Sequence, residues 1–222
     1  MLNKIIGGSS IAIVAAVAFS ASTTQAQLVD GSFENPFQSL TAAITLATVN
    51  EGWDVNFGGA TASQSSAYAE DGSYSLLTYN AIGNNWNPVG TYQVVSGISV
   101  GSQYTLSVYA MAPTALTGNY GTPIDVQLQF FNSSLVNITT TETGWSTLGA
   151  LGSWKQYSVT ATAPAGAVYA APYLMFMDNG QTAQDNVYFD NATLTVVPEP
   201  STLALLSLGL AVPFYFIRRR KS

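Results

Sequence analysis

Twelve acidic side chains carry the reactive chemistry of this 222-residue chain, which contains no histidine and no cysteine. Ser-His-Asp and Cys-His nucleophiles need an imidazole, and the usual zinc, copper and haem sites use histidine or cysteine ligands. Those classes of site are therefore excluded. Carboxylates leave two alternatives: a glycosidase-type acid pair roughly 5–10 Å apart across a sugar cleft, or a calcium ion held by about six to eight oxygens.

Residues 198–222 form a segment of three parts. Pro198, Glu199 and Pro200 come first, an apolar run at 203–217 follows, and four basic residues come next: Arg218, Arg219, Arg220 and Lys221. A bilayer crossing takes roughly 20 apolar residues, and a basic cluster holds its end of the helix in the cytoplasm. We therefore expect a short C-terminal transmembrane helix, with everything before Pro198 outside.

This order of motif, short span and basic tail closely resembles the PEP-CTERM sorting signal of Gram-negative and related bacteria. The resemblance implies that an integral-membrane exosortase recognises the segment. It also implies transient anchoring in the inner membrane, followed by export to the cell surface or the extracellular matrix. The alternative is an ordinary C-terminal membrane anchor.

The N-terminus has the three parts of a secretory signal peptide. Lys4 supplies the positive charge, residues 11–19 form an apolar stretch, and small residues lead to Ala26. This pattern predicts passage through the Sec machinery and cleavage after Ala26. Residues 1–26 and 198–222 are then targeting segments, and residues 27–197 form the folded domain.

The folded domain is strongly acidic. Residues 27–197 contain eleven acidic residues and one basic residue, Lys155, which gives a formal charge of −10. Affinity for nucleic acid comes mainly from Lys and Arg that neutralise phosphates, so nucleic-acid binding is excluded. The excess of acids suits hard cations, neutral polymers or simple solubility.

The apolar pattern of residues 27–197 is that of β-strands. Apolar and polar residues alternate at 104–109, 126–130 and 154–160, and residues 187–189 with 194–196 form a last strand. Turn residues recur every 8–12 positions, and no helical period lasts three turns. The sequence predicts one all-β domain, a single β-sandwich. Residues 38–49 fit less well and are left open as a loop, a strand or a short helical turn.

Six local patterns follow one another in a fixed order. They lie at residues 28–35 with Gly52-Trp53, 70–76, 93–95, 100–107, 154–164 and 187–191. This succession resembles the galactose-binding-like jelly roll of the family 4/9 carbohydrate-binding modules, over about residues 28–196. The resemblance implies a jelly-roll sandwich and a carbohydrate ligand. Within it we expect core positions for Phe33, Trp53, Tyr104 and Trp154.

The resemblance also implies a structural calcium ion, the one cofactor expected. Many jelly rolls of this class hold such an ion between the first strand, an early loop and the last strand. Transferred to this sequence, the ligands are Ser32, Glu34, Glu70, Ser73 and Asp190, with Asp71 as the alternative to Glu70. The other alternative is a set of exposed carboxylates without a metal.

A sugar site needs an exposed aromatic ring beside amide or carboxylate groups. Trp86 lies in an Asn- and Gly-rich loop, where a core tryptophan is unexpected, and Trp145 is a weaker candidate. The alternative for Trp86 is a cover over the end of the sandwich. We expect hydrogen bonds to the ligand from Asn85, Asn87, Tyr92, Gln127 and Gln129.

Three functions remain open at this point. The first is a non-enzymatic surface or matrix protein that contributes to the exopolysaccharide or biofilm layer. The second is a carbohydrate-binding module with a defined glycan, and the third is a carbohydrate-active enzyme. The remaining acids are scattered singly in turn-rich surroundings, which disfavours the enzyme. The expected partners are the Sec machinery, the exosortase and an extracellular polysaccharide.

Overall fold

The computed structural model describes residues 26–35, 49–55, 60–80, 87–116, 124–178 and 185–197. The predicted signal peptide up to Gln25, almost all of the ambiguous segment 38–49, and the sorting segment with Pro198, Glu199, Pro200 and its basic residues lie outside these ranges. Within them, no helix is long and apolar enough to cross a membrane.

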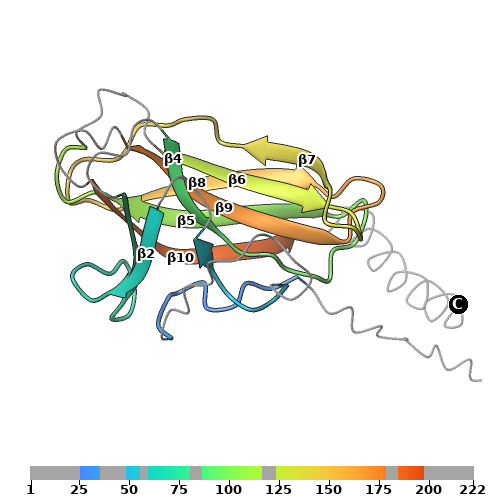
Figure 1. Ribbon diagram of the computed structural model, residues 1–222, viewed down its shortest axis with the longest axis horizontal. Coiled ribbons are helices and arrows are strands. Elements are labelled where there is room, and N and C mark those ends of the chain that lie inside the picture. Colours follow the sequence, from blue (N-terminus) through green and yellow to red (C-terminus); the bar gives the residue numbers. More distant parts are fainter. Residues whose placement is uncertain are drawn as a thin grey trace, which may run out of the picture.

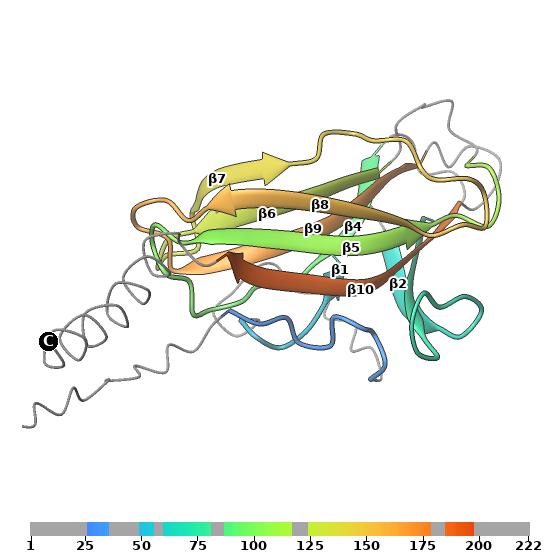
Figure 2. The same cartoon turned by 180° about the vertical axis from the view of Figure 1, so that it is seen from behind.

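In the described ranges, ten strands form two five-stranded sheets that pack face to face (Figures 1 and 2). The first sheet has the order β1-β4-β9-β6-β7 and the second β2-β3-β10-β5-β8. Their bounds are β1 Asp54–Val55, β2 Ala60–Ser65, β3 Ser75–Asn80, β4 Asn87–Tyr92, β5 Gln103–Met111, β6 Ile124–Phe131, β7 Asn137–Glu142, β8 Lys155–Thr162, β9 Tyr169–Asp178 and β10 Asn186–Val197. All pairs between these strands are antiparallel. The predicted all-β sandwich is confirmed.

Alternation along the strands decides which face meets the core. In β5, Tyr104, Leu106 and Val108 are buried while the residues between them are partly exposed, as expected for a sheet with one face in the core. Residues 187–189 and 194–196, which the sequence predicts as the last strand, lie on one strand, β10. β10 carries an irregularity between Asp190 and Thr193, where Asn191 has a left-handed φ of 49°.

The main core confirms three of the four expected core aromatics. Phe33, Trp53 and Tyr104 are at most 2% exposed, and the rings of Phe33 and Trp53 lie 5.2 Å apart. Phe33 reaches the core from a turn, with a φ of 56°, and not from a strand. The expectation for Trp154 is wrong: it is half-buried and lies outside the core cluster, because β8 begins only at Lys155.

Tyr157 provides a prediction at alkaline pH. Burial raises the pKa of its phenol from 10 to about 12, and its hydroxyl donates to the Thr147 carbonyl at 2.8 Å. The unfolded chain ionises this group first, so stability from Tyr157 is present below pH 10 and is lost as pH rises towards 12. The interval between these two pKa values corresponds to roughly 2–3 kcal/mol in the free energy of unfolding.

Chemical denaturation of the protein and of Tyr157→Phe between pH 9 and 12 measures this effect. Because the other tyrosines ionise in both proteins, the informative quantity is the difference between the two unfolding free energies. We expect this difference to shrink with rising pH. A difference that does not change with pH would contradict the assignment.

Candidate functional site

The first sheet carries a second apolar cluster on its outer face. In β6 and β9, Leu128 and Leu174 point into the main core, so the residues that alternate with them point outward. An outer face of an antiparallel sheet is normally polar. Here it is apolar and aromatic over β4, β9 and the end of β6: Tyr92, Val94, Phe131, Ala171, Tyr173 and Met175.

A row of four residues crosses this face from strand to strand. Tyr92 on β4 pairs with Tyr173 on β9, Tyr173 pairs with Gln127 on β6, and Gln127 pairs with Glu142 on β7. The two tyrosine rings are stacked, with centroids 5.0 Å apart and planes at 18°. Both are at most 3% exposed. Trp145 is half-buried and packs against the same cluster.

Gln127 and Glu142 of the row belong to a longer chain of side-chain hydrogen bonds on β6 and β7. Asn137 Nδ2 donates to Gln129 Oε1, and Gln129 Nε2 donates to Gln127 Oε1, both at 2.8 Å. Gln127 Nε2 then donates to two carboxylates, Asp125 Oδ2 and Glu142 Oε2, each at 2.8 Å. The prediction that the remaining acids are scattered singly is therefore wrong for this pair. Cross-strand pairing brings them to one amide.

The accessible groups of this face include Gln127, Gln129, Glu142 and the half-buried Trp145, whereas the stacked tyrosines lie beneath the surface. Asp125 is completely buried, and its second oxygen accepts from the Thr143 hydroxyl at 3.1 Å. Its orientation is thus set from two sides, and it fixes Gln127 in turn. The accessible amides and Glu142 can hydrogen-bond the hydroxyls of a sugar while the Trp145 ring covers its apolar face.

Of the six residues predicted for the main sugar site, the structure brings together Tyr92, Gln127 and Gln129, and Asn87 is the first residue of β4. Trp86 and Asn85 lie outside the described residues. The sequence analysis missed Tyr173, Asp125 and Glu142. A signal for Tyr173 was present, because β9 is apolar at odd and even positions alike, which is typical of a strand buried on both faces.

The predicted calcium residues surround the loop of residues 66–74, which joins β2 to β3 and is called the 66–74 loop below. Glu34 holds one side of it: Glu34 Oε1 accepts the backbone N–H groups of Ser73 and Tyr74, each at 2.9 Å. Gly72 makes this approach possible. It has a left-handed φ of 71°, and a Cβ there would overlap the Glu34 carboxylate.

Asp190 on β10 holds the other side of the 66–74 loop. Its Oδ2 accepts from the backbone N–H groups of Glu70 at 2.7 Å and Asp71 at 3.3 Å. Its Oδ1 accepts from Asn191 N at 2.6 Å, and Asn191 Nδ2 donates to Glu70 Oε2 at 3.3 Å. Burial raises the pKa of Asp190, while these backbone hydrogen bonds lower it in part.

The fit of a calcium ion depends on which oxygens are available. Asp190 uses both oxygens, and Glu34 uses Oε1, to accept N–H groups of the backbone. Among the described residues, no three acidic side chains gather closely enough to hold a metal ion. The structure thus confirms that Glu34, Asp190 and the 66–74 loop are neighbours, and a calcium ion among them stays a proposal.

Chelation tests the calcium proposal. If an ion binds, the melting temperature should be higher in calcium than in EDTA, because a ligand at a hundred times its Kd adds about 2.7 kcal/mol of stability. Glu34→Ala and Asp190→Ala should each remove that difference. Identical melting curves of the unaltered protein in calcium and in EDTA would contradict the proposal.

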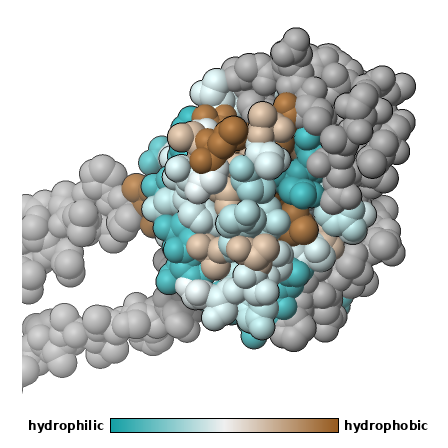
Figure 3. Space-filling model, turned by 90° about the vertical axis from the view of Figure 1, so that its left-hand side faces the viewer, coloured by the Kyte–Doolittle hydropathy of each residue, from teal (hydrophilic) through white to brown (hydrophobic). Residues whose placement is uncertain are grey.

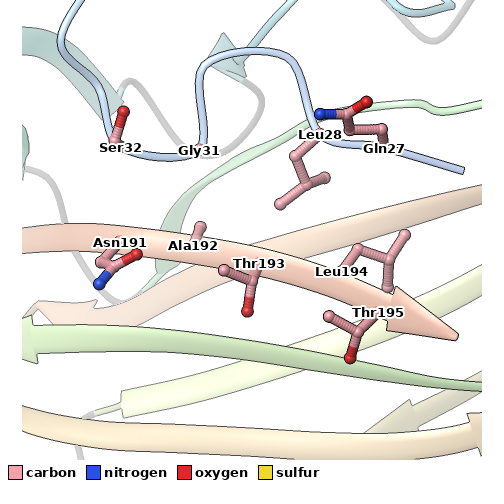
Figure 4. A pocket seen from close by; sticks show the side chains of 9 residues that line it. All are labelled: Gln27, Leu28, Gly31, Ser32, Asn191, Ala192, Thr193, Leu194 and Thr195. Carbon is pink, nitrogen blue, oxygen red and sulfur yellow. The ribbon is translucent and has the colours of Figure 1, made fainter. Parts of the chain in front are cut away.

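A cavity of about 360 Å³ lies between the N-terminal segment and β10. In Figure 4, Leu28 and Leu194 flank this space, while the side chains of Thr193 and Thr195 point away from the N-terminal segment. Ser32, the remaining predicted calcium residue, is exposed and its side chain also points away from β10. The cavity shares no residue with the row on the first sheet, and we assign it to packing of the N-terminal segment.

Figure 3 shows the side of the molecule that lies on the left in Figure 1. Its hydrophobic residues form small separate groups among hydrophilic and neutral ones. Isolated apolar residues of this kind are normal on a protein surface. This side of the described surface therefore gives no indication of a broad hydrophobic docking area.

Two sequence-family models match the chain. A family model described as a carbohydrate binding domain matches residues 25–175, more than half of the chain. The chain belongs to this family. A second model, described as the PEP-CTERM protein-sorting motif, matches residues 196–221. Both resemblances seen in the sequence are confirmed, and the sorting motif indicates export with a C-terminal anchoring region before processing. No curated protein matches the chain.

Solved structures with a TM-score of 0.50 include two larger proteins. One is the enzymatically active domain of tailspike protein 4 of bacteriophage CBA120, 12% identical, where the match covers 66% of this chain and 20% of that chain. The other is the CBM22-1–GH10 part of Clostridium thermocellum xylanase 10B complexed with xylohexaose, 16% identical, covering 78% and 29%. The carbohydrate-binding domain thus spans less than a third of either, and at these identities the likeness shows the fold alone.

Proposed function

We propose that this protein is an exported, non-enzymatic carbohydrate-binding protein of the cell surface or extracellular matrix, processed by an exosortase. It binds a neutral polysaccharide of the biofilm layer on the outer face of the first sheet. The proposal rests on the family and on one structural observation. The outer face of β6 and β7 presents a fixed chain of amides and carboxylates, beside the half-buried Trp145 and next to a buried aromatic pair on β4 and β9.

Charge supports a neutral ligand. The folded part of the chain carries a formal charge of −10, and its one basic residue, Lys155, lies on β8 in the other sheet. Lys155 Nζ is held by the Thr147 carbonyl at 2.6 Å. An acidic polysaccharide would meet the exposed Glu142, with buried Asp125 behind it and no cation beside them, whereas a neutral sugar offers hydroxyl donors that suit the Glu142 carboxylate.

The same geometry argues against catalysis. A glycosidase places the scissile oxygen between its two carboxyl groups. Between Asp125 and Glu142 that space is filled by the Gln127 amide, which donates to both. The alternative acid pair, Glu34 and Asp190, is engaged with backbone amides of the 66–74 loop. The functions left as alternatives are a module for one defined glycan and, less well supported, a carbohydrate-active enzyme.

Calorimetric titration of the exported protein with neutral xylo- and gluco-oligosaccharides tests the proposed site. We expect Gln127→Ala to weaken binding about tenfold, because one or two lost hydrogen bonds are worth roughly 1.4 kcal/mol. Trp145→Ala should weaken it by a similar factor through lost ring contact.

Gln103→Ala serves as the matched control for Gln127→Ala. Gln103 is an exposed glutamine on β5 in the opposite sheet, so its removal should leave binding unchanged. If Gln127→Ala and Trp145→Ala bind as tightly as the unaltered protein, the face of the first sheet is not the site. Release of reducing ends from any polysaccharide would contradict the non-enzymatic assignment.

A further inference from the structure

The 66–74 loop presents the two most exposed aromatic residues of the described chain. Tyr68 is 42% exposed and Tyr74 is 38% exposed, and the other large hydrophobic residues with comparable exposure in the described ranges are aliphatic. In Figures 1 and 2 the loop projects from the end of β2, at the corner of the sandwich opposite to β7. It is therefore separate from the site on the first sheet.

The Tyr68 ring and the backbone at Tyr74 are held in place. The Tyr68 ring packs edge-on against Tyr188 of β10, with centroids 5.0 Å apart and planes at 70°. The Tyr68 carbonyl accepts from the Ser75 hydroxyl at 2.5 Å, and the Tyr74 N–H donates to Glu34. A tyrosine fixed in this way offers a large contact area for little loss of conformational entropy on binding.

The backbone between the two tyrosines is fixed as well. Asp190 accepts the N–H groups of Glu70 and Asp71, and Glu34 accepts those of Ser73 and Tyr74. Two carboxylates from distant parts of the chain thus orient a loop whose tip is exposed. Anchoring of this kind pre-organises the loop, which lowers the entropic cost of binding a ligand there.

The chemistry of the 66–74 loop selects the ligand. It offers ring faces, the acceptor groups of Glu70 and Asp71 and the Ser73 hydroxyl, and it contains no basic residue. Anionic polymers are repelled by such a surface, and a purely apolar partner leaves the carboxylates unpaired. A neutral sugar matches both the rings and the acceptors.

We propose that the 66–74 loop is a second carbohydrate-binding element, which takes a neutral sugar unit on Tyr68 and Tyr74. The inference rests on the proposed function, since it assumes the same class of ligand. Two binding elements at opposite corners let one molecule bridge two polysaccharide chains. The protein then cross-links a matrix as well as adhering to it, and its avidity for a long chain exceeds that of either element.

Light scattering of the exported protein mixed with a long, soluble neutral arabinoxylan measures the bridging, and calorimetry with xylohexaose measures the binding. We expect Tyr68→Ala/Tyr74→Ala to weaken binding at the loop about fivefold to thirtyfold, as truncation of anchoring aromatics does. This variant should still bind through the first sheet but no longer bridge. Tyr68→Phe/Tyr74→Phe keeps the rings and should bridge, and Leu151→Ala, another exposed residue, should change nothing.

Several outcomes separate this inference from the proposed function. Bridging by Tyr68→Ala/Tyr74→Ala at the level of the unaltered protein would overturn the inference. A complete loss of sugar binding in Trp145→Ala/Gln127→Ala would also overturn the inference. It would leave the proposed function intact, with the first sheet as the single site. Scattering by the protein without polysaccharide would assign the loop to self-association and also overturn the inference. Binding that vanishes only in the loop variant would support the loop and contradict the site on the first sheet.

Discussion

Asp190→Ala should destabilise the protein by about 3 kcal/mol or more, because three backbone N–H groups lose their acceptor and each unpaired, partly buried donor costs roughly 1–3 kcal/mol. The donors are those of Glu70, Asp71 and Asn191. Denaturant unfolding measures the loss. Hydrogen exchange should show faster exchange at Glu70 and Asp71, because the 66–74 loop is no longer held against β10.

Asp71→Ala is the matched control for this prediction. Asp71 is an exposed acid in the same loop, and its side chain accepts a hydrogen bond from the neighbouring Gly72 N–H. Its removal changes the charge equally and should alter stability by no more than about 0.5 kcal/mol. Equal effects of the two substitutions would mean that charge, and not the anchoring of the loop by Asp190, controls stability.

Deletion of Arg218–Lys221 should abolish processing of the tail and leave the precursor at full length in the inner membrane. The basic cluster fixes the orientation of the preceding apolar run, and it lies within the matched sorting motif, residues 196–221. Glu199→Ala should have the same effect, because proline favours extended backbone and Glu199 is the one charged residue between two prolines of the matched motif. Cell fractionation and intact mass of the product measure both effects.

Deletion of Ser222 is the control for the shortened tail, because this residue lies just outside the matched motif. It should leave the mature mass and the yield at the cell surface unchanged. If the variants of Glu199 and of the basic cluster also give the normal mature mass and yield, the tail is an ordinary anchor and the proposed exosortase processing is wrong.

The strands were predictable from the sequence because their information is local. In β5, β6 and β8 the apolar residues alternate over six or more positions, and this alternation also told which face of β6 carries Gln127 and Gln129. Trp154 was misplaced because the pattern does not tell where a strand begins to a single residue. β8 starts one position later, and the Trp154 side chain is only half-buried and lies outside the core cluster.

The composition of the site depended on pairings that the sequence does not encode locally. Tyr92 and Tyr173 stack only because β4 lies beside β9 in one register, although 80 residues separate them. Asp125 and Glu142 meet at Gln127 for the same reason, through the pairing of β6 with β7. A shift of either register by one residue would turn these side chains to the other face.

The roles of the acids at the 66–74 loop were predictable only in part. The structure places Glu34 and Asp190 on two sides of the 66–74 loop that contains Glu70, and a calcium ion among them stays a proposal. The resemblance did not indicate that backbone N–H groups would occupy the oxygens of Asp190 and one oxygen of Glu34. Those contacts follow from the turn at Gly72 and the irregularity of β10 at Asp190, which are features of three-dimensional structure.

A crystal structure of the exported protein with a neutral oligosaccharide such as xylohexaose tests the central claim most directly. The account predicts a sugar chain on the outer face of β4, β9, β6 and β7, with hydroxyls bonded to Gln127 or Glu142 and a ring of the sugar against Trp145. Sugar bound only in the cavity beside β10, or no sugar at saturating concentration, would contradict it.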